Sequence, residues 1–298
     1  MRVVSLVPAA TEIAAAIGAL GDLVAVTHDC DHPVAVRSLP RVTRSTIPVG
    51  ADSAAIDAAV RDAAARGDST FHLDDDALRH AGPDVLLGQT LCRVCAVTLD
   101  RIPTTWSSTP IVVPLEATTI EGIFEDISRV GAALERADSA SALVVELRSR
   151  LRRTESSVAG AQRPRIACLE WIAPLFNAGH WVPEQVRIAG AEDVLGQPGA
   201  RSREITWAEL EDAAPEWIFI MLCGFDAQRA VHEASALADT PAWRSLFAVR
   251  DGRVFVLDGN AYFSRPGPRI VDGVQLLASI LHPELVLAPA GASALPLA

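Results

Sequence analysis

Residues 3–27 read VVSLVPAATEIAAAIGALGDLVAVT, and their pattern predicts a strand, a helix and a second strand. Val3–Val7 and Leu23–Thr27 are short apolar runs rich in β-branched residues, which is typical of buried strands. Pro8 interrupts the first run, and an Ala-rich apolar helix follows it as far as Gly18. This order of elements is typical of a mostly parallel sheet with helices packed on it.

The same alternation of strands and helices continues through both halves of the chain. The first half adds the apolar runs Val85–Leu87 and Ile111–Leu115 and the Ala-rich helical pattern Ala54–Ala65. The strands expected in the second half are Ile166–Leu169, Trp217–Leu222 and Val254–Leu257. We therefore expect an α/β fold with two Rossmann-like lobes, at residues 1–115 and 161–298.

A long helical pattern lies between the two lobes. Apolar residues recur at three- and four-residue steps from Ile120 to Leu134, and the pattern resumes from Leu143 to Leu151. We expect a backbone helix within residues 116–160, which at 1.5 Å per residue would reach about 60 Å. The alternative is a break near Ala137.

The C-terminal segment 288–298 is rich in Ala and Pro and has no periodicity. Chain ends of this kind are ordered only when they pair or dock with the fold. We expect this tail to be poorly ordered.

Composition excludes several classes of partner. The 298-residue chain is half hydrophobic, so it reads as globular, and its formal net charge of −11 disfavours nucleic acid, because phosphate binding needs a basic face. Membrane insertion is not expected, because no apolar run approaches the ~20 residues of a membrane-spanning helix. The start of the sequence has neither the features of a secretory signal nor a lipid-anchor cysteine, so we expect a cytoplasmic location.

Four of the five cysteines follow apolar strands, where the loops at one edge of a parallel sheet meet. They are Cys30, Cys92, Cys95 and Cys223. Thiolates are ligands for iron–sulfur clusters and zinc, and four is the usual number for either, so we predict a shared metal centre, with a cluster favoured over zinc. The alternatives are that Cys92 and Cys95 form a redox pair or are buried structural thiols. Cys168 lies within a strand and is expected in the core.

Two segments carry a resemblance to a known family. The opening Ser5–Glu12, with the helix and strand that follow it, and the closing Trp243–Asp258 resemble the class III substrate-binding proteins of ABC transporters, especially the cobalamin-binding branch. The resemblance implies two Rossmann-like lobes joined by a helical backbone, with a ligand cleft between the lobes. It also implies a small-molecule metal chelate, a corrinoid or a relative of one, as the ligand, and an ABC transporter as a possible partner.

Six side chains in loops at the expected sheet edges are candidates for ligand binding. They are His28, Trp171, His180, Trp181, Tyr262 and Arg265. Aromatic walls suit a large planar ligand, an imidazole can meet the metal of a corrinoid or haem, and an Arg can contact a carboxylate or phosphate. The alternatives are that the tryptophans pack in the core of the second lobe and that Tyr262 and Arg265 serve helix capping and surface charge.

No catalytic motif is present, so a binding protein is favoured over an enzyme. The alternative function is a cytosolic metalloprotein or enzyme with a cysteine-held iron–sulfur cluster or zinc in the cleft.

Overall fold

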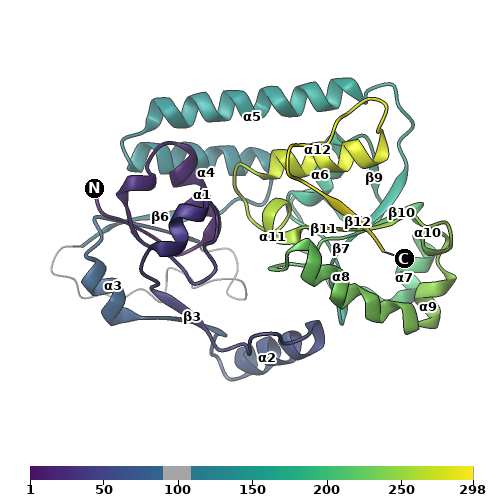
Figure 1. The fold of residues 1–298 in the computed structure, drawn as a ribbon, viewed down its shortest axis with the longest axis horizontal. Helices are drawn as coiled ribbons and strands as arrows, with labels where there is room; N and C mark the ends of the chain where they lie inside the picture. Colours follow the sequence, from purple (N-terminus) through teal and green to yellow (C-terminus); the bar gives the residue numbers. More distant parts are fainter. Residues whose placement is uncertain (90–108, 298) are drawn as a thin grey trace. The chain divides into compact units, whose positions relative to one another are not determined.

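The computed structural model describes residues 1–89 and 109–297 (Figure 1). Its contacts divide the chain into two compact units. Unit 1 comprises Met1–Ala117 and Glu121–Glu146, and unit 2 comprises Thr118–Ile120 and Leu147–Ala298. Each unit is an α/β structure with its own sheet, as the sequence predicted.

The main sheet of unit 1 is parallel, in the strand order β2-β1-β5-β6. Its strands are β1 (Val3–Ser5), β2 (Leu23–Ala25), β5 (Val85–Gln89) and β6 (Ile111–Leu115). Helix α1 (Pro8–Ala16) connects β1 to β2, and Pro8 suits its first turn, where an N–H would have no helical partner. The four predicted strands of this half are confirmed.

The core of unit 1 lies between this sheet and α3 (Asp75–Ala81). Val4 and Leu86 are register partners on β1 and β5, and they share one fully buried cluster with Leu78 of α3. The helix begins where the Asp74 carboxylate accepts the Ala77 N–H at 2.9 Å. It ends at Gly82, whose φ of 52° is left-handed, so α3 turns directly into β5.

A second, two-stranded antiparallel sheet of unit 1 joins β3 (Thr43–Ser45) to β4 (Phe71–Leu73). Ser45 pairs with Phe71, and alternate residues of a strand share a face, so Thr43, Ser45 and Phe71 lie on the same face. The other helical segments of this part of unit 1 are η1 (Leu20–Asp22), η2 (Val34–Ser38) and α2 (Ser53–Ala65).

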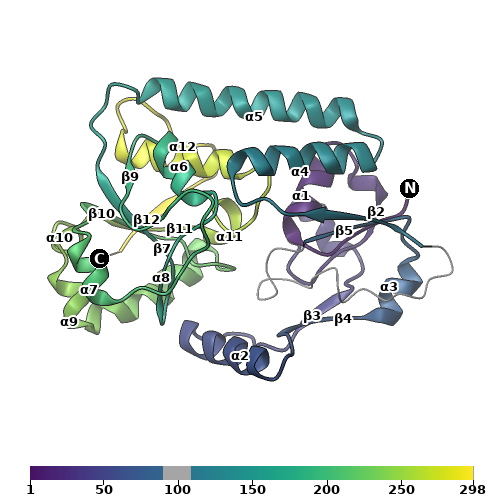
Figure 2. The ribbon, with the colours of Figure 1, turned by 180° about the vertical axis from the view of Figure 1, so that it is seen from behind.

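Residues 120–157 are helical apart from a short break, but they do not form the single helix expected within residues 116–160. They form α4 (Ile120–Ala133) and α5 (Ala137–Ser157), which Figure 2 shows as separate helices. The break lies just before the expected alternative position at Ala137. The division between the two units falls within α5.

The break between α4 and α5 has a local cause. Glu135 has a left-handed φ of 57°, and the N–H of Arg136 donates back to the carbonyl of Gly131 at 2.7 Å. Gly131 also lies against Ala140, so closely that a Cβ at position 131 would overlap the Cβ of Ala140. The backbone therefore reverses after α4, and α5 starts by packing on it.

The sheet of unit 2 is mixed, in the order β12-β11-β10-β7-β8, with β9 beside β7. Its strands are β7 (Arg165–Ile172), β8 (Leu175–Asn177), β9 (Glu192–Asp193), β10 (Trp217–Ile220), β11 (Val254–Leu257) and β12 (Ala294–Pro296). The neighbours β7, β10 and β11 are parallel, whereas β8 and β12 are antiparallel to the strands beside them. The three predicted strands of this half are confirmed.

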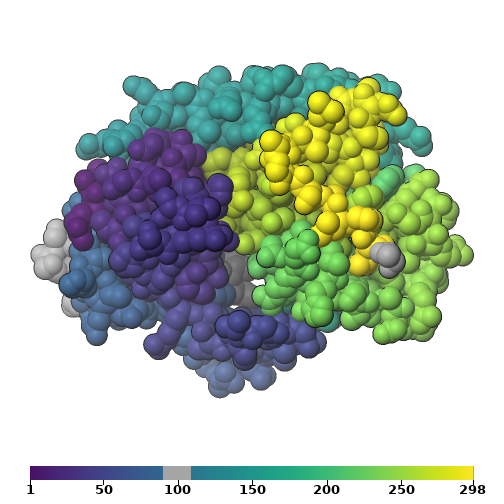
Figure 3. All heavy atoms as spheres, viewed as in Figure 1, coloured from purple at the N-terminus to yellow at the C-terminus, as the bar shows by residue number. Residues whose placement is uncertain are grey.

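The expectation of a poorly ordered tail over residues 288–298 is wrong for residues 294–297. Leu295 pairs with Val256 in an antiparallel ladder, and the N–H of Leu297 donates to the carbonyl of Val254 at 3.0 Å. Figure 3 shows atoms of the yellow C-terminal part of the chain on the visible face of the molecule. A strand neighbour supplies the backbone partners that composition alone did not reveal.

Helices cover the sheet of unit 2. They are α6 (Val182–Ile188), α7 (Trp207–Asp212), α8 (Ala227–Ser235), η4 (Ala236–Asp239), α9 (Pro241–Ser245), α10 (Phe247–Arg250), α11 (Gly259–Tyr262) and α12 (Ile270–Leu281). Thr206 and Glu209 form a reciprocal capping box that starts α7. Among the described residues, every helix is too short or too polar to span a membrane.

Candidate functional site

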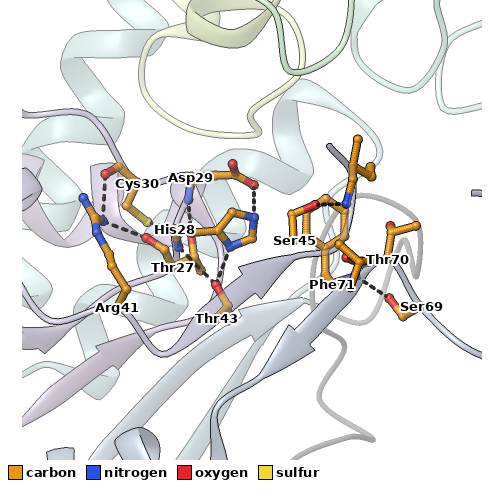
Figure 4. A network of polar contacts seen from close by, with 12 residues as sticks. Thr27, His28, Asp29, Cys30, Arg41, Thr43, Ser45, Ser69, Thr70 and Phe71 are labelled. Atoms are coloured by element: carbon orange, nitrogen blue, oxygen red, sulfur yellow. Dashed lines mark hydrogen bonds and ion pairs between the residues drawn. The ribbon is translucent and has the colours of Figure 1, made fainter. Parts of the chain in front are cut away.

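A tight turn follows β2 at the carboxyl edge of the parallel sheet in unit 1 (Figure 4). The N–H of Cys30 donates to the carbonyl of Thr27 at 3.3 Å, and the N–H of Asp29 donates to the Thr27 hydroxyl at 3.2 Å. Arg41 Nη1 donates to the carbonyl oxygens of Thr27 and Cys30 at 2.7 and 2.9 Å. The guanidinium thus fixes both ends of the turn that presents His28.

The His28 ring is held on two sides. Its Nδ1 lies 2.7 Å from Thr43 Oγ1, which also accepts the backbone N–H of His28 at 3.1 Å. The ring stacks on Phe71, with centroids 5.3 Å apart. Nε2 is buried without a hydrogen-bond partner among the described residues, and the Asp29 carboxylate lies 3.4 Å from it.

Burial lowers the pKa of His28, and Arg41 lowers it further, although Asp29 acts in the opposite direction. The imidazole is therefore mainly neutral at pH 7. A neutral imidazole with one nitrogen hydrogen-bonded is the form that binds metals.

Of the four cysteines in the predicted metal centre, the structure describes Cys30 and Cys223. Cys30 is buried, and its thiol lies 3.0 and 3.2 Å from the hydroxyls of Thr11 and Thr27. Cys92 and Cys95 lie outside the described residues. Cys223 is half-buried in unit 2. Over residues 1–89 and 109–297, no three His, Cys, Asp or Glu side chains are placed to hold a metal ion. Cys168 is buried in β7, and burial raises its thiol pKa well above the ordinary value.

A second candidate surface lies at the carboxyl ends of β7 and β10 in unit 2. Half-buried Trp171 meets the ring of Phe225 edge-on, with centroids 5.5 Å apart, and its indole N–H donates to Ala173 O at 3.2 Å. The guanidinium of Arg229 lies 3.7 Å from the Phe225 ring centroid. Cys223 sits on the same edge, where its N–H donates to Glu170 O at 3.1 Å. Phe225 is 3% exposed, so the half-buried indole of Trp171 is the aromatic face that suits a planar ligand.

His180 and Trp181 have different roles in unit 2. Trp181 is 5% exposed, and its indole N–H donates to the carbonyl of Phe263 at 2.9 Å, so it packs in the core. His180 is half-buried and has a left-handed φ of 55°. Burial lowers the pKa of His180, and Arg201 lowers it further. The two rings lie 5.6 Å apart, centroid to centroid.

Tyr262 and Arg265 follow β11 at the same edge as Trp171. The N–H of Asn260 donates to Phe225 O at 3.1 Å, which joins α11 to the loop after β10. Arg265 is 7% exposed. Burial raises the pKa of Tyr262, and Asp258 and Asp272 add to the rise. Tyr262 is the more accessible of the two candidate residues.

Sequence reasoning missed Thr43, Phe71 and Phe225. Thr43 and Phe71 reach His28 only because β3 pairs with β4, and no spacing in the sequence marks that pairing. Phe225 follows Cys223 by two residues in the loop after β10, so its place after a predicted strand could have identified it.

A model of the family described as periplasmic binding protein matches residues 3–261. No curated protein sequence matches the chain.

Solved structures share the fold over nearly the whole chain. A periplasmic heme binding protein from Pseudomonas aeruginosa is 22% identical, with a TM-score of 0.72, over 99% of this chain and 94% of that one. The periplasmic vitamin B12 binding protein BtuF of Vibrio cholerae is 19% identical, with a TM-score of 0.65, over 94% and 96%. An ABC-type Fe3+-hydroxamate transport system structure from Saccharomonospora viridis is 20% identical, with a TM-score of 0.64, over 94% and 93%.

Proposed function

The chain belongs to the periplasmic binding protein family, and from that membership we propose that it binds a metal chelate, a corrinoid or a related complex such as haem, for an ABC transporter. The similar structures are named for heme, vitamin B12 and an iron hydroxamate. These ligands differ in shape but share a metal held by an organic chelator. The class of ligand is therefore better supported than any one member of it.

The observation that carries the proposal is the half-buried indole of Trp171, which packs edge-on against the buried ring of Phe225. It stands at the carboxyl ends of parallel strands, the edge at which open α/β sheets bind their ligands. Arg229 adds a positive charge beside it. A large planar chelate with acidic side groups would stack on the indole and meet the guanidinium.

Titration with aquocobalamin, haemin and a ferric hydroxamate tests the proposal through Trp fluorescence and calorimetry. We expect saturable binding of at least one chelate, weakened about tenfold or more by Trp171→Ala. Trp217→Ala is the matched control, because Trp217 is also half-buried in unit 2 but starts β10, at the opposite edge of the sheet. Absence of saturable binding with all three chelates, or equal losses in the two variants, would contradict the proposal.

Three expectations from the sequence remain predictions. A ligand held between the two lobes should raise the hydrogen-exchange protection of loops in both units, at residues 27–30 and 223–225. A cytoplasmic location can be checked by cell fractionation.

A cysteine-held iron–sulfur cluster would yield iron and acid-labile sulfide after anaerobic purification. A zinc site would yield zinc, without iron or sulfide. In both cases Cys92→Ser should lose the bound metal.

A further inference from the structure

We propose that His28 Nε2 coordinates the metal of the bound chelate, and that the Asp29 carboxylate covers this nitrogen until the chelate displaces it (Figure 4). The inference rests on the proposed function and narrows it. It restricts the ligands to chelates whose metal has an exchangeable axial position.

The first support is the rigid placement of the ring. Thr43 Oγ1 contacts both the backbone N–H and Nδ1 of His28, so backbone and side chain are tied to the same oxygen. Phe71 stacks on the ring and resists rotation. Rotation of the imidazole would break the 2.7 Å contact with Thr43, so Nε2 keeps one direction.

The second support is the unsatisfied state of Nε2. This nitrogen has no hydrogen-bond partner among the described residues, although buried polar atoms are nearly always paired. The Asp29 carboxylate, 3.4 Å away, attracts an N–H there without completing a hydrogen bond. An atom left in this state is available to a stronger partner.

The third support is the hydroxyl of Thr43, which can donate or accept. While Asp29 faces an Nε2–H, the hydroxyl donates to Nδ1.

When the metal binds, its axial water leaves and the Nε2 lone pair forms the new bond. The Nε2 proton passes to solvent, Nδ1 takes a proton from solvent, and Thr43 becomes the acceptor. The ring stays neutral and no electron is transferred. Second-sphere groups commonly orient metal-binding imidazoles in this way.

Asp29 is placed to act as a movable cover. Its side chain is 49% exposed, so the carboxylate can turn towards water. Its backbone stays fixed, because the Asp29 N–H donates to the Thr27 hydroxyl. Displacing the cover therefore leaves the turn intact.

The ligand classes separate on this chemistry. Aquocobalamin and haemin carry replaceable axial ligands, whereas a ferric tris-hydroxamate has all six positions filled by its chelator. We expect the first two to bind with a shift of their visible absorption bands, and the hydroxamate to bind at least tenfold more weakly.

Absorption titration of the full chain with aquocobalamin and haemin tests the inference. His28→Ala should lose the band shift and bind about tenfold more weakly. Asp29→Ala should bind aquocobalamin and haemin several-fold more tightly. Asp76→Ala, which removes an exposed carboxylate of unit 1, should not change the affinity.

Thr43→Ser should behave as wild type, and Thr43→Val should lose most of the shift of the absorption band. Nitrogen-15 NMR of the ligand-free chain reads the His28 tautomer directly and confirms that each variant is folded.

The possible failures are distinguishable. If no chelate binds to the wild-type chain, the proposed function fails together with the inference. If aquocobalamin or haemin binds with an unshifted spectrum, and His28→Ala binds equally well, only the inference is overturned. Tighter binding of the hydroxamate than of both other chelates would also overturn the inference alone.

Discussion

Asp193 is a half-buried residue, and its two carboxylate oxygens have different surroundings. Oδ1 accepts the N–H groups of Leu195 and Gly196 at 3.0 and 2.8 Å, and Oδ2 is buried without a partner among the described residues. Burial raises the pKa of Asp193 to about 6, against the pull of those two hydrogen bonds. The folded chain therefore holds a proton at pH 5 that the unfolded chain has mostly released.

This carboxylate predicts that stability falls as pH rises. Between the ordinary pKa of 3.8 and about 6, the folded state binds more protons than the unfolded state, so unfolding becomes easier with increasing pH. The rise from 3.8 to about 6 corresponds to roughly 3 kcal/mol at full ionisation. Asp193→Asn should remove this component, which urea unfolding at pH 4, 5, 6 and 7 would measure. Asp76→Asn, at a fully exposed carboxylate, should leave the profile unchanged. Parallel profiles for wild type and Asp193→Asn would contradict the assignment.

At the residue scale, the sequence located candidate positions better than it assigned their roles. His28 follows the end of a predicted strand, and that position is enough to identify it as a candidate for ligand binding. Its partner Thr43 does not stand out, because the contact depends on how β3 pairs with β4. Trp181 stands out in the sequence, because an aromatic residue beside a histidine suggests the wall of a ligand site. In the structure its indole N–H instead donates to the carbonyl of Phe263 in the core.

At the element scale, the strands were predictable, whereas the break between α4 and α5 was only an alternative and its tight reversal was not predicted. Buried parallel strands leave continuous apolar runs, which need no tertiary information to recognise. The break after α4 falls at Glu135, a residue type that seldom adopts a left-handed φ. The apolar pattern is interrupted between Leu134 and Leu143, which allowed a break near Ala137 only as an alternative. Gly131 is the informative residue, but its role appears only when α5 is packed on α4.

The packing of α4 on α5 predicts a cost for Gly131→Ala. In an isolated helix this change would gain about 1 kcal/mol of helix propensity. Here the added methyl would overlap Ala140, so we expect a net loss of about 1–3 kcal/mol in the free energy of unfolding, measured with urea. Gly160→Ala is the control, because no atom lies within 4 Å of the added methyl. A stabilised Gly131→Ala protein would show that the helices separate freely.

The edge strand β12 predicts an effect of shortening the chain. Removal of residues 294–298 takes away the ladder on β11 and the hydrogen bond from Leu297 to Val254. Amide exchange of Val256 and its neighbours should accelerate by at least tenfold, because an unpaired edge opens more readily. Amide exchange of β1 in unit 1 should not change. Unaltered exchange at Val256 would show that the tail does not stabilise the sheet.

At the scale of the whole molecule, the two-lobe organisation could be predicted because the same order of helix, turn and strand occurs in both halves of the chain. Helix α3 leads into β5, and helix α7 leads into β10, each through a short turn with a Pro and an acid. The chain passes between the units at three places, after Ala117, Ile120 and Glu146. The last of these lies inside α5, so the two units share one continuous helix.

The shared helix predicts that a break in α5 destabilises the whole chain. Val145 is 61% exposed in the middle of α5, one residue before Glu146, so a change there removes little packing. Val145→Pro would delete one helical hydrogen bond and clash with the preceding turn, at a cost of about 3 kcal/mol or more. Val145→Ala keeps the helix and should stay within about 0.5 kcal/mol of wild type. Urea unfolding measures both variants, and limited proteolysis should show a new cut near residue 146 only in the proline variant. Equal stability of the two variants would mean that the two units fold without a continuous α5.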